Sequence, residues 1–425
     1  MRPELFIANR LSPSEANGEK APVGVRIGVA GVTLAFVVML LSLAVVTGFK
    51  NEIRRKVTGY ESQIVIQGRQ TEQAQYFGEL STVALNARIR HDIAGTLGSD
   101  VTTATVTDVP VLLKTDSAFS ALILRTVDPS FDRSFIRDNI VDGTWDSDSA
   151  ASQIVISEPT AAQLGLGVGD RVYAHFFRSG AITTRRYTIE GIFNTYFDDY
   201  DRHFAFADGR LGHAVTRLPD SLATSIMING IGDDVDLETA SSALESAIVF
   251  DALSEGGSTS DIPSVSNVRQ RGAMYLNWLD LLDTNVVVIL SLMAVVAGFT
   301  LISSLFILIL ERVPMIGLLK AVGARDSQIR GIFIWLCEKI VLRGLLLGNI
   351  IGLTLYFIQH IWHVMPLDAE AYYLSYVPTS LSFTTWLLLN AGVIAGSFIV
   401  LVLPSHIITR MSPVDCLRRD TQGDE

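Results

Sequence analysis

Apolar residues gather in four long runs along the chain, and shorter alternating runs fill the stretch between the first two. The long runs are Ile27 to Phe49, Thr284 to Leu310, about Gly331 to Trp362, and Leu381 to Leu403. A helix needs about 20 apolar residues to cross a hydrocarbon core of roughly 30 Å, because lipid offers the backbone no hydrogen-bond partners. The pattern therefore predicts four transmembrane helices.

The third run differs from the others because it contains charges. Glu338, Lys339 and Arg343 lie in its first half, and only Gly344 to Trp362 is free of charge. Such side chains either lie near the membrane surface and extend toward water, or form an ion pair that faces another helix. The sequence leaves both interpretations open.

The stretch between the first two runs mixes strand and helix signals. Alternating apolar and polar residues predict strands at 63–67, 109–114, 120–127, 153–157 and 185–193. Helices are predicted at 157–165, with Ser157 as the N-cap and Gly165 as the stop, and at 236–248. This mixture predicts an α+β domain of two lobes.

One predicted hairpin in this domain carries aromatic residues. A tight turn over 166–170 leads into a strand that ends near Phe177, and a loop returns the chain as the strand 185–193. Phe176, Phe177 and Arg178 form a docking surface if the tip is exposed. A hairpin with two buried aromatic side chains is the alternative.

Composition agrees with a membrane protein that has a soluble domain. The 425 residues are 49% hydrophobic and 18% charged, with a mean hydropathy of +0.36, which is too apolar for an ordinary soluble protein. Residues 51–275 hold 30 acidic and 19 basic residues, and the rest of the chain is balanced. The domain therefore lacks the basic field that nucleic acid requires. Cys337 and Cys416 both lie outside the domain, so they form no disulfide within it.

Basic residues near the apolar runs predict the orientation. Lys and Arg occur in the N-terminal segment, in 311–330 and in the C-terminal tail, whereas the loop 363–380 has none. Short basic flanks stay in the cytoplasm, so the loop 363–380 and the large domain are expected on the other side. The first run is longer than the core of a signal peptide, so we expect it to remain as an anchor.

These expectations divide the chain into segments. They are a cytoplasmic N-terminal segment 1–24, a first transmembrane helix 25–49, an external α+β domain 50–275, a second transmembrane helix 276–310 with an external extension, a cytoplasmic amphipathic helix and loop 311–330, a third transmembrane helix 331–362, a short external loop 363–380, a fourth transmembrane helix 381–404 and a cytoplasmic tail 405–425. The fold class is thus a four-helix membrane protein with a large α+β domain inserted between helices 1 and 2.

The stretch after the second run is amphipathic. Met315, Leu318, Leu319 and Val322 recur at the spacing of one helix face, and Gly323 provides a stop. Such a helix is either a peg seated in a partner protein or a helix that lies on the lipid surface. No HExxH, GxSxG, paired CxxC or Walker A motif occurs in the chain, so the sequence predicts no enzymatic site or nucleotide site of its own.

Several stretches resemble one family. MIGLLKAVGA (315–324) resembles the coupling-helix signature of FtsX-like and MacB-like ABC permeases. LFIANR (5–10), VVTGFKNEI (45–53), TVDPSF (126–131), LGLGVGDRV (164–172), IEGIF (189–193) and LPSHIITRMSPVDCLR (403–418) resemble, in order, segments of the lipoprotein-releasing permeases of the LolC/LolE type. The resemblance covers essentially the whole chain.

The resemblance implies a function in the bacterial inner membrane, with the large domain in the periplasm. The chain would be a permease subunit that extracts acylated lipoproteins from the outer leaflet and passes them to a LolA-like periplasmic carrier. Its other expected partners are membrane lipid, a LolD-like cytoplasmic ABC ATPase that binds ATP and Mg²⁺, and a second permease subunit. The two permease subunits would form a homodimer or a LolC/LolE-like heterodimer. No cofactor or metal is expected on this chain, and no nucleic acid is expected as a partner.

The resemblance also implies functional residues. The ATPase-coupling residues would be Glu311, Met315, Gly317, Leu318, Lys320, Ala321, Gly323 and Ala324. The lipoprotein cavity would be lined by Met39, Leu43, Val46 and Phe49 of the first helix and by Phe299, Ile302, Ser303 and Phe306 of the second. Lipid contact or helix packing is the alternative for each of these.

Two other functions belong to related permeases. One is the gating of a cell-wall hydrolase, and the other is MacB-like efflux. Hydrolase regulators usually have a much smaller external domain, and efflux relatives usually fuse the ATPase to the chain. The hairpin from Phe176 to Arg186 is shorter than the carrier-docking hairpin of the family and has no proline.

Overall fold

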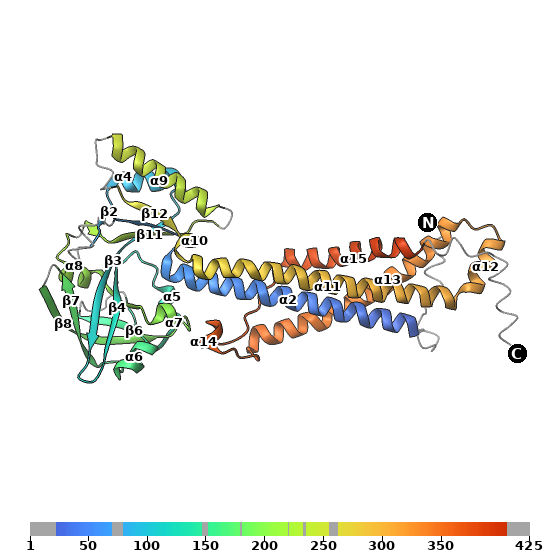
Figure 1. Cartoon of the computed structure of the whole chain (residues 1–425), viewed down its shortest axis with the longest axis horizontal. Coiled ribbons are helices and arrows are strands. Elements are labelled where there is room, and N and C mark those ends of the chain that lie inside the picture. Colours follow the sequence, from blue (N-terminus) through green and yellow to red (C-terminus); the bar gives the residue numbers. More distant parts are fainter. Residues whose placement is uncertain are drawn as a thin grey trace. The chain divides into compact units, whose positions relative to one another are not determined.

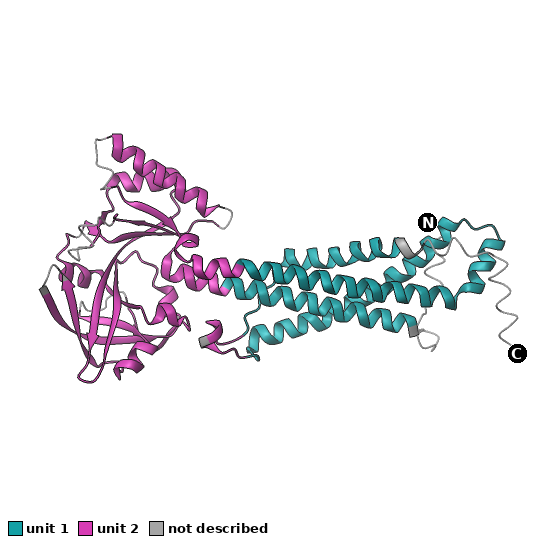
Figure 2. Cartoon of the chain, in the orientation of Figure 1, with its two compact units in different colours: residues 1–51, 280–365, 377–425 teal, residues 52–279, 366–376 magenta. Residues whose placement is uncertain are grey.

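The computed structural model describes residues 23–69, 80–146, 152–178, 181–219, 221–232, 235–254 and 262–405. The chain divides into two compact units (Figure 2). Unit 1 comprises residues 1–51, 280–365 and 377–425, and unit 2 comprises residues 52–279 and 366–376. Most of the expected N-terminal segment and nearly all of the expected tail lie outside the described residues.

Unit 1 is built from long helices (Figure 1). Within the described residues, four helices are long and apolar enough to cross a membrane, as the sequence predicts. They are α2 (Val23–Glu61), α11 (Ala273–Glu311), α13 (Asp326–Trp362) and α15 (Phe383–Ser405). Helices α2 and α11 each have 39 residues, and the last turns of α2 and the first turns of α11 belong to unit 2.

Close helix contacts hold this bundle together. Phe36, Leu40, Leu305 and Phe333 are buried in its core. A Cβ atom added at Gly344 of α13 would lie 2.8 Å from the Val32 side chain of α2, so only glycine allows this approach. Small residues at such crossings are typical of membrane helices, where tight packing replaces the hydrophobic effect. The short helix α12 (Val313–Ala321) connects α11 to α13.

Unit 2 contains a closed β-barrel. Each strand in the series β3 (Thr102–Lys114), β4 (Phe119–Val127), β9 (Phe204–Asp208), β6 (Gln153–Ser157), β8 (Ala181–Phe193) and β7 (Arg171–Arg178) pairs with the next, and β7 pairs back with β3. Closure leaves these strands without a free edge. The interior is filled by side chains such as Leu113, Leu124, Ile156 and Val172.

An open sheet continues from the same long strand. The first residues of β3 pair with β11 (Ser225–Asn229), followed by β1 (Ile64–Gln67) and β12 (Ser264–Asn267). Helices α4 (Ala87–Leu97) and α9 (Leu237–Ser254) contribute to a second hydrophobic core with these strands. Unit 2 therefore has two cores, and β3 belongs to both the barrel and the open sheet.

The shorter elements complete unit 2. They are β2 (Val83–Ala84), α5 (Ser134–Arg137), β5 (Ile140–Gly143), α6 (Glu158–Leu164), α7 (Asp198–Asp201), α8 (Gly209–Thr216), β10 (Leu222–Ala223), α10 (Val268–Arg271) and α14 (Ala369–Tyr372). The predicted limits of α6 are confirmed: the Ser157 side chain accepts a hydrogen bond from the Thr160 amide, and Gly165 ends the helix with φ of 66°.

Candidate functional site

Helix α12 packs one face on unit 1 and exposes the other. Val313, Ile316 and Gly317 are buried, and Met315 and Leu319 pack partly on the same core. The predicted stripe of Met315, Leu318, Leu319 and Val322 is therefore divided in the structure: Met315 and Leu319 pack on the bundle, whereas Leu318 and Val322 are exposed. A short helix joined to two long ones packs one of its faces on its own bundle. In α12 this face contains Val313, Ile316 and Gly317, and it only partly coincides with the predicted stripe.

The exposed part of α12 is the candidate contact for a partner. Leu318 is 62% exposed and Val322 is 81% exposed. Ala321, also among the predicted coupling residues, is exposed beside them. Gly323 follows with φ of 92°, a left-handed conformation that favours glycine and turns the chain toward α13.

The remaining predicted coupling residues surround this patch. Glu311 is exposed and Ala324 is half-buried. Lys320 forms an ion pair with Asp326, with 3.1 Å between Nζ and Oδ1. Because Asp326 begins α13, this pair links the end of α12 to the start of the next helix.

The residues predicted to line a lipoprotein cavity fall into two groups. On α11, Phe299, Ser303 and Phe306 are exposed and Ile302 is half-buried. On α2, Met39 and Phe49 are buried, and Leu43 and Val46 are half-buried.

The structure does not bring the two groups together within one chain. Met39 packs against Ala297 of α11 and lines a cavity between α2, α11 and α15. Phe299 does not line that cavity and is 68% exposed. The α11 group is therefore the one that is free to contact lipid, substrate or another protein.

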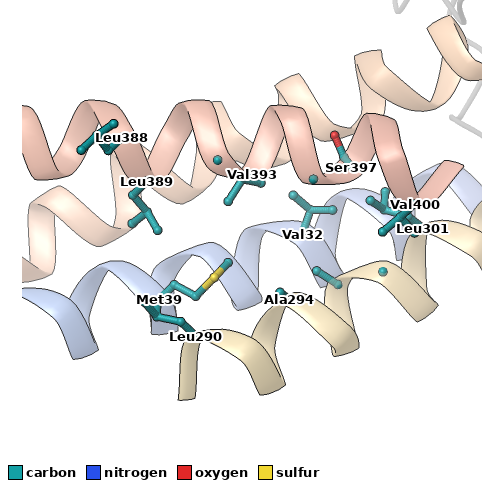
Figure 3. A pocket seen from close by; sticks show the side chains of 14 residues that line it. Val32, Met39, Leu290, Ala294, Leu301, Leu388, Leu389, Val393, Ser397 and Val400 are labelled. Atoms are coloured by element: carbon teal, nitrogen blue, oxygen red, sulfur yellow. The ribbon is translucent and has the colours of Figure 1, made fainter. Parts of the chain in front are cut away.

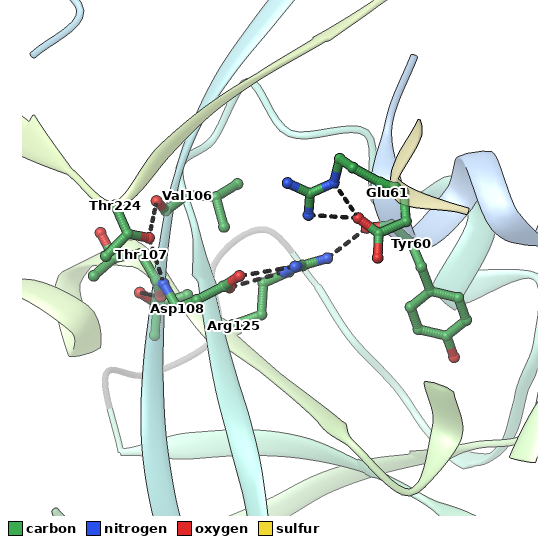
Figure 4. A network of polar contacts seen from close by, with 9 residues as sticks. Tyr60, Glu61, Val106, Thr107, Asp108, Arg125 and Thr224 are labelled. Carbon is green, nitrogen blue, oxygen red and sulfur yellow. Dashed lines mark hydrogen bonds and ion pairs between the residues drawn. The ribbon is translucent and has the colours of Figure 1, made fainter. Parts of the chain in front are cut away.

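A buried polar network holds the end of α2 in unit 2 (Figure 4). Arg125 of β4 donates from Nε and Nη2 to the two carboxylate oxygens of Asp108, at 2.9 and 2.8 Å. Its Nη1 donates to the backbone carbonyl of Tyr60, in the last turn of α2. The Arg125 guanidinium there satisfies a carbonyl that the helix leaves unpaired. Its positive charge also interacts favourably with the negative end of the helix dipole.

The next residue of α2 reaches the segment that leads into α11. Glu61 accepts a hydrogen bond from Nε of Arg271 and forms an ion pair with the same guanidinium; Arg271 ends α10 just before α11 begins. The guanidinium of Arg125 also lies 4.3 Å from the centre of the Phe204 ring. Within unit 2, the ends of both long helices are thus tied to each other and to the barrel.

The sequence contains one signal for this network. Arg125 interrupts the apolar run 120–127, and a charge in an otherwise buried strand needs a partner. The sequence gives no comparable signal for Tyr60, because it contributes a backbone carbonyl to Arg125.

A second cluster in unit 2 surrounds the carboxyl of Asp201. The Tyr60 hydroxyl donates to Asp201, as do the hydroxyl of Thr195 at 2.7 Å and its amide at 3.0 Å. Burial raises the pKa of the Asp201 carboxyl above its ordinary value, although these hydrogen bonds act in the opposite direction. Lys56 adds hydrogen bonds to the carbonyls of Thr195 and Tyr373.

The two aromatic residues of the hairpin formed by β7 and β8 differ in exposure, so neither an exposed pair nor a buried pair describes them. Phe176 is 3% exposed and lies in the barrel core, so the expectation that it docks a carrier is wrong. Phe177 is 58% exposed, because successive residues of a strand face opposite sides. The side chain of Arg178 and the tip at 179–180 lie outside the described part of the chain.

The position of Glu338 fits neither interpretation of the charges in the third helix, which were extension toward water and an ion pair with another helix. Its side chain is 5% exposed, so it does not extend toward water. Its carboxylate accepts a hydrogen bond from the Ser397 hydroxyl of α15, at 3.2 Å. Arg343 is exposed.

Within the described residues, no group of three or more His, Cys, Asp or Glu side chains is placed to hold a metal ion.

Comparison with known families defines the class of protein. The family model of the MacB-like periplasmic core domain matches residues 27–247, and that of the FtsX-like permease C-terminal region matches residues 287–413. The chain therefore belongs to the family of permeases with a MacB-like periplasmic core domain.

Its relatives among characterised proteins are of the LolC/LolE type. The chain is 22% identical over 407 residues to the lipoprotein-releasing system transmembrane protein LolC of Xylella fastidiosa, covering 92% of each chain. It is 21% identical to LolC of Neisseria meningitidis serogroup B, covering 92% of this chain and 93% of that one. It is 25% identical to LolE of Haemophilus influenzae over 154 residues, which is 34% of this chain and 37% of that one.

Solved structures show weaker likenesses. The periplasmic region of MacB from Actinobacillus actinomycetemcomitans aligns with a TM-score of 0.32 and 14% identity, over 52% of this chain and 96% of that one. The extracellular domain of the transporter YknZ aligns with a TM-score of 0.32 and 12% identity, over 48% of this chain and 99% of that one. Scores this low add nothing to the family assignment.

Proposed function

We propose that this chain is the membrane subunit of an ABC transporter that extracts lipoproteins from the outer leaflet of the bacterial inner membrane and passes them to a periplasmic carrier. The observation that carries the proposal is the match, over 92% of the chain, to proteins named for lipoprotein release. Acyl chains are held in a bilayer by about 0.8 kcal/mol per buried CH₂ group, so a triacylated protein does not leave without work.

In this proposal a separate ATPase subunit supplies the work. The basic residues Arg312, Arg325 and Arg330 support a cytoplasmic location for α12. The exposed side chains of Leu318 and Val322 would then enter a groove of the ATPase. ATP and Mg²⁺ would bind to that subunit, and its closure would push on α12 and, through it, on α11.

A second permease subunit, identical or homologous, would complete the lipoprotein cavity. The support is the outward face of α11, where Phe299 and Phe306 remain exposed in one chain. These residues would contact the acyl chains, and unit 2 would lie in the periplasm and receive the carrier. On the hairpin, Phe177 rather than Phe176 is the residue available for that contact.

Depletion of the chain combined with site-specific crosslinking tests this function. Depletion should leave lipoproteins in the inner membrane. A photo-crosslinking amino acid in place of Phe299 or Phe306 should trap a triacylated lipoprotein in the absence of ATP and lose it when ATP is added. The same amino acid in place of Leu346, an exposed apolar residue of α13, serves as the control. Normal lipoprotein sorting after depletion, or equal trapping at Leu346, would overturn the proposal.

A further inference from the structure

A half-open cavity of about 280 Å³ lies between α2, α11 and α15 of unit 1 (Figure 3). Val32 and Met39 of α2, Leu290 and Ala294 of α11, and Leu389 and Val393 of α15 contribute to its lining. Ser397 also lines it, and its hydroxyl is already engaged with the Ile394 carbonyl and the Glu338 carboxylate. The cavity is therefore lined almost wholly by hydrocarbon.

Two glycines of α15 keep this cavity open. Gly392 and Gly396 lie one turn apart, and both line it. A Cβ atom added to either would meet no other atom within 4 Å. There is thus open space beside α15 at both positions, and larger side chains there would begin to fill it.

Polar contacts hold α15 on α13 rather than on the helices across the cavity. The indole Nε1 of Trp386 donates to Asn349 Oδ1 at 2.7 Å, and Asn349 Nδ2 donates to Asn390 Oδ1 at 2.8 Å. With the Ser397 contact to Glu338, these bonds fix α15 along α13. The cavity therefore stays where α15 meets α2 and α11.

Hydrocarbon is the material that fits this space. A buried water needs two to four polar partners, which this lining does not offer, and an apolar cavity left empty lowers stability in proportion to its volume. The cavity opens at exposed residues, including Ala294, Leu388 and Gly392. On membrane helices, those residues face lipid.

We propose that this cavity binds one acyl chain of a bilayer phospholipid, with the head group left at the membrane surface. The bound chain fills the gap between α15 and the pair formed by α2 and α11, and so keeps α15 at a fixed distance from them. The site is separate from the face of α11 that is proposed to contact lipoproteins, although Met39 of α2, one of the residues predicted to line the lipoprotein cavity, also lines it. At 100° per residue, the α11 residues that line it are centred about 150° around the helix from Phe299 and Phe306.

A photoreactive phospholipid tests the site. The full-length chain is placed in nanodiscs of phosphatidylethanolamine and phosphatidylglycerol that contain a phosphatidylcholine with a diazirine in the middle of one acyl chain. After irradiation, we expect adducts on the segments that contain Ala294 and Val393. The double variant Gly392→Leu, Gly396→Leu fills the cavity and should lower the adduct yield there several-fold.

Ala395→Leu is the matched control, because it adds the same side chain at an exposed position of α15 that does not line the cavity. It should leave the yield unchanged. Adding the phospholipids back to the protein in detergent should raise the unfolding temperature of the unaltered chain and of the control, but not of the filled variant. Gly392→Leu alone serves if the double variant does not fold.

Two results would overturn the proposal. One is an equal adduct yield in the filled variant, the unaltered chain and the control. The other is labelling of the cavity by a lipoprotein with a photoreactive acyl chain but not by the phospholipid probe. Neither result bears on lipoprotein release itself, which the Phe299 and Phe306 crosslinks test separately.

Discussion

Arg125 is one of the residues that connect α2 to the barrel. It is buried, pairs with both oxygens of Asp108, and donates to the Tyr60 carbonyl. We expect Arg125→Ala to destabilise unit 2 by about 3 kcal/mol, the lower end of the range for a broken buried pair, because Asp108 is partly exposed. Denaturant unfolding of the full-length chain in detergent measures this change.

The control for this prediction is a surface ion pair of the same type. Arg202 pairs with Asp198 at 3.0 Å, and its side chain is more than half exposed. Arg202→Ala should cost less than about 1 kcal/mol, because water screens the pair. Equal losses in the two variants would contradict the role assigned to Arg125.

We expect the buried carboxyl of Asp201 to make the stability of unit 2 depend on pH. Burial raises the pKa of its carboxyl above the ordinary value of 3.8, so the folded protein holds this proton more tightly than the unfolded chain does. The stabilisation of the folded state by this protonated carboxyl is complete below pH 3.8, and it is lost as the pH rises through the raised pKa. We expect the unfolding temperature to fall across that window more steeply in the unaltered chain than in Asp201→Asn. Parallel pH profiles of the two proteins would contradict this assignment.

At the level of single residues, the sequence shows which side chains are apolar or charged, but it does not show which residues they contact. Phe176 and Phe177 are chemically identical neighbours, and only the pairing of β7 with β3 and β8 decides which one enters the barrel. Glu338 is visible as a charge in an apolar run, but its partner Ser397 lies 59 residues away on another helix. Such contacts depend on tertiary packing, which periodicity does not report.

Helix α12 is the element on which the proposed coupling to an ATPase depends. Leu318→Asp in α12, or Val322→Asp directly after it, places a charge on this exposed apolar patch. We expect binding of the partner ATPase to fall at least about tenfold, because an unpaired charge in an apolar contact costs roughly 1.4 kcal/mol or more. Co-purification of the ATPase with each variant measures the loss, while the chain itself should still insert in the membrane.

Ser327→Asp is the control for these variants, since it adds the same charge at an exposed polar position at the start of α13. It should retain the ATPase. Gly317 would be a poor position for the test, because it is buried on the bundle of its own chain. If the Leu318 and Val322 variants bind the ATPase as well as the control does, α12 is not the contact.

The sequence predicted elements more successfully than it predicted their connections. The runs at 120–127 and 153–157 are strands β4 and β6, and the helix at 157–165 has the expected cap. The closed barrel was not predicted, because β4 pairs in parallel with β9, about 80 residues further along the chain. Local patterns identify a strand but do not identify a neighbour so distant in the sequence.

The orientation of the whole molecule in the membrane is a prediction from its basic residues. A reporter fused after Arg325 should be cytoplasmic, and reporters fused after Asp208 or Asp368 should be periplasmic, because short basic flanks stay in the cytoplasm. Reporter activity specific to each compartment measures the side. Finding the fusions at 208 and 325 on the same side would contradict the proposed topology.

The uninterrupted length of α2 and α11 limits how this chain can change during evolution. Each has 39 residues, about 58 Å at 1.5 Å per residue, while the hydrocarbon core occupies roughly 30 Å. One residue inserted in either helix would turn the rest of that helix by about 100° about its own axis. Seven residues nearly complete two turns and restore the original facing. Homologues with longer or shorter versions of these helices are therefore expected to differ in steps of about seven residues.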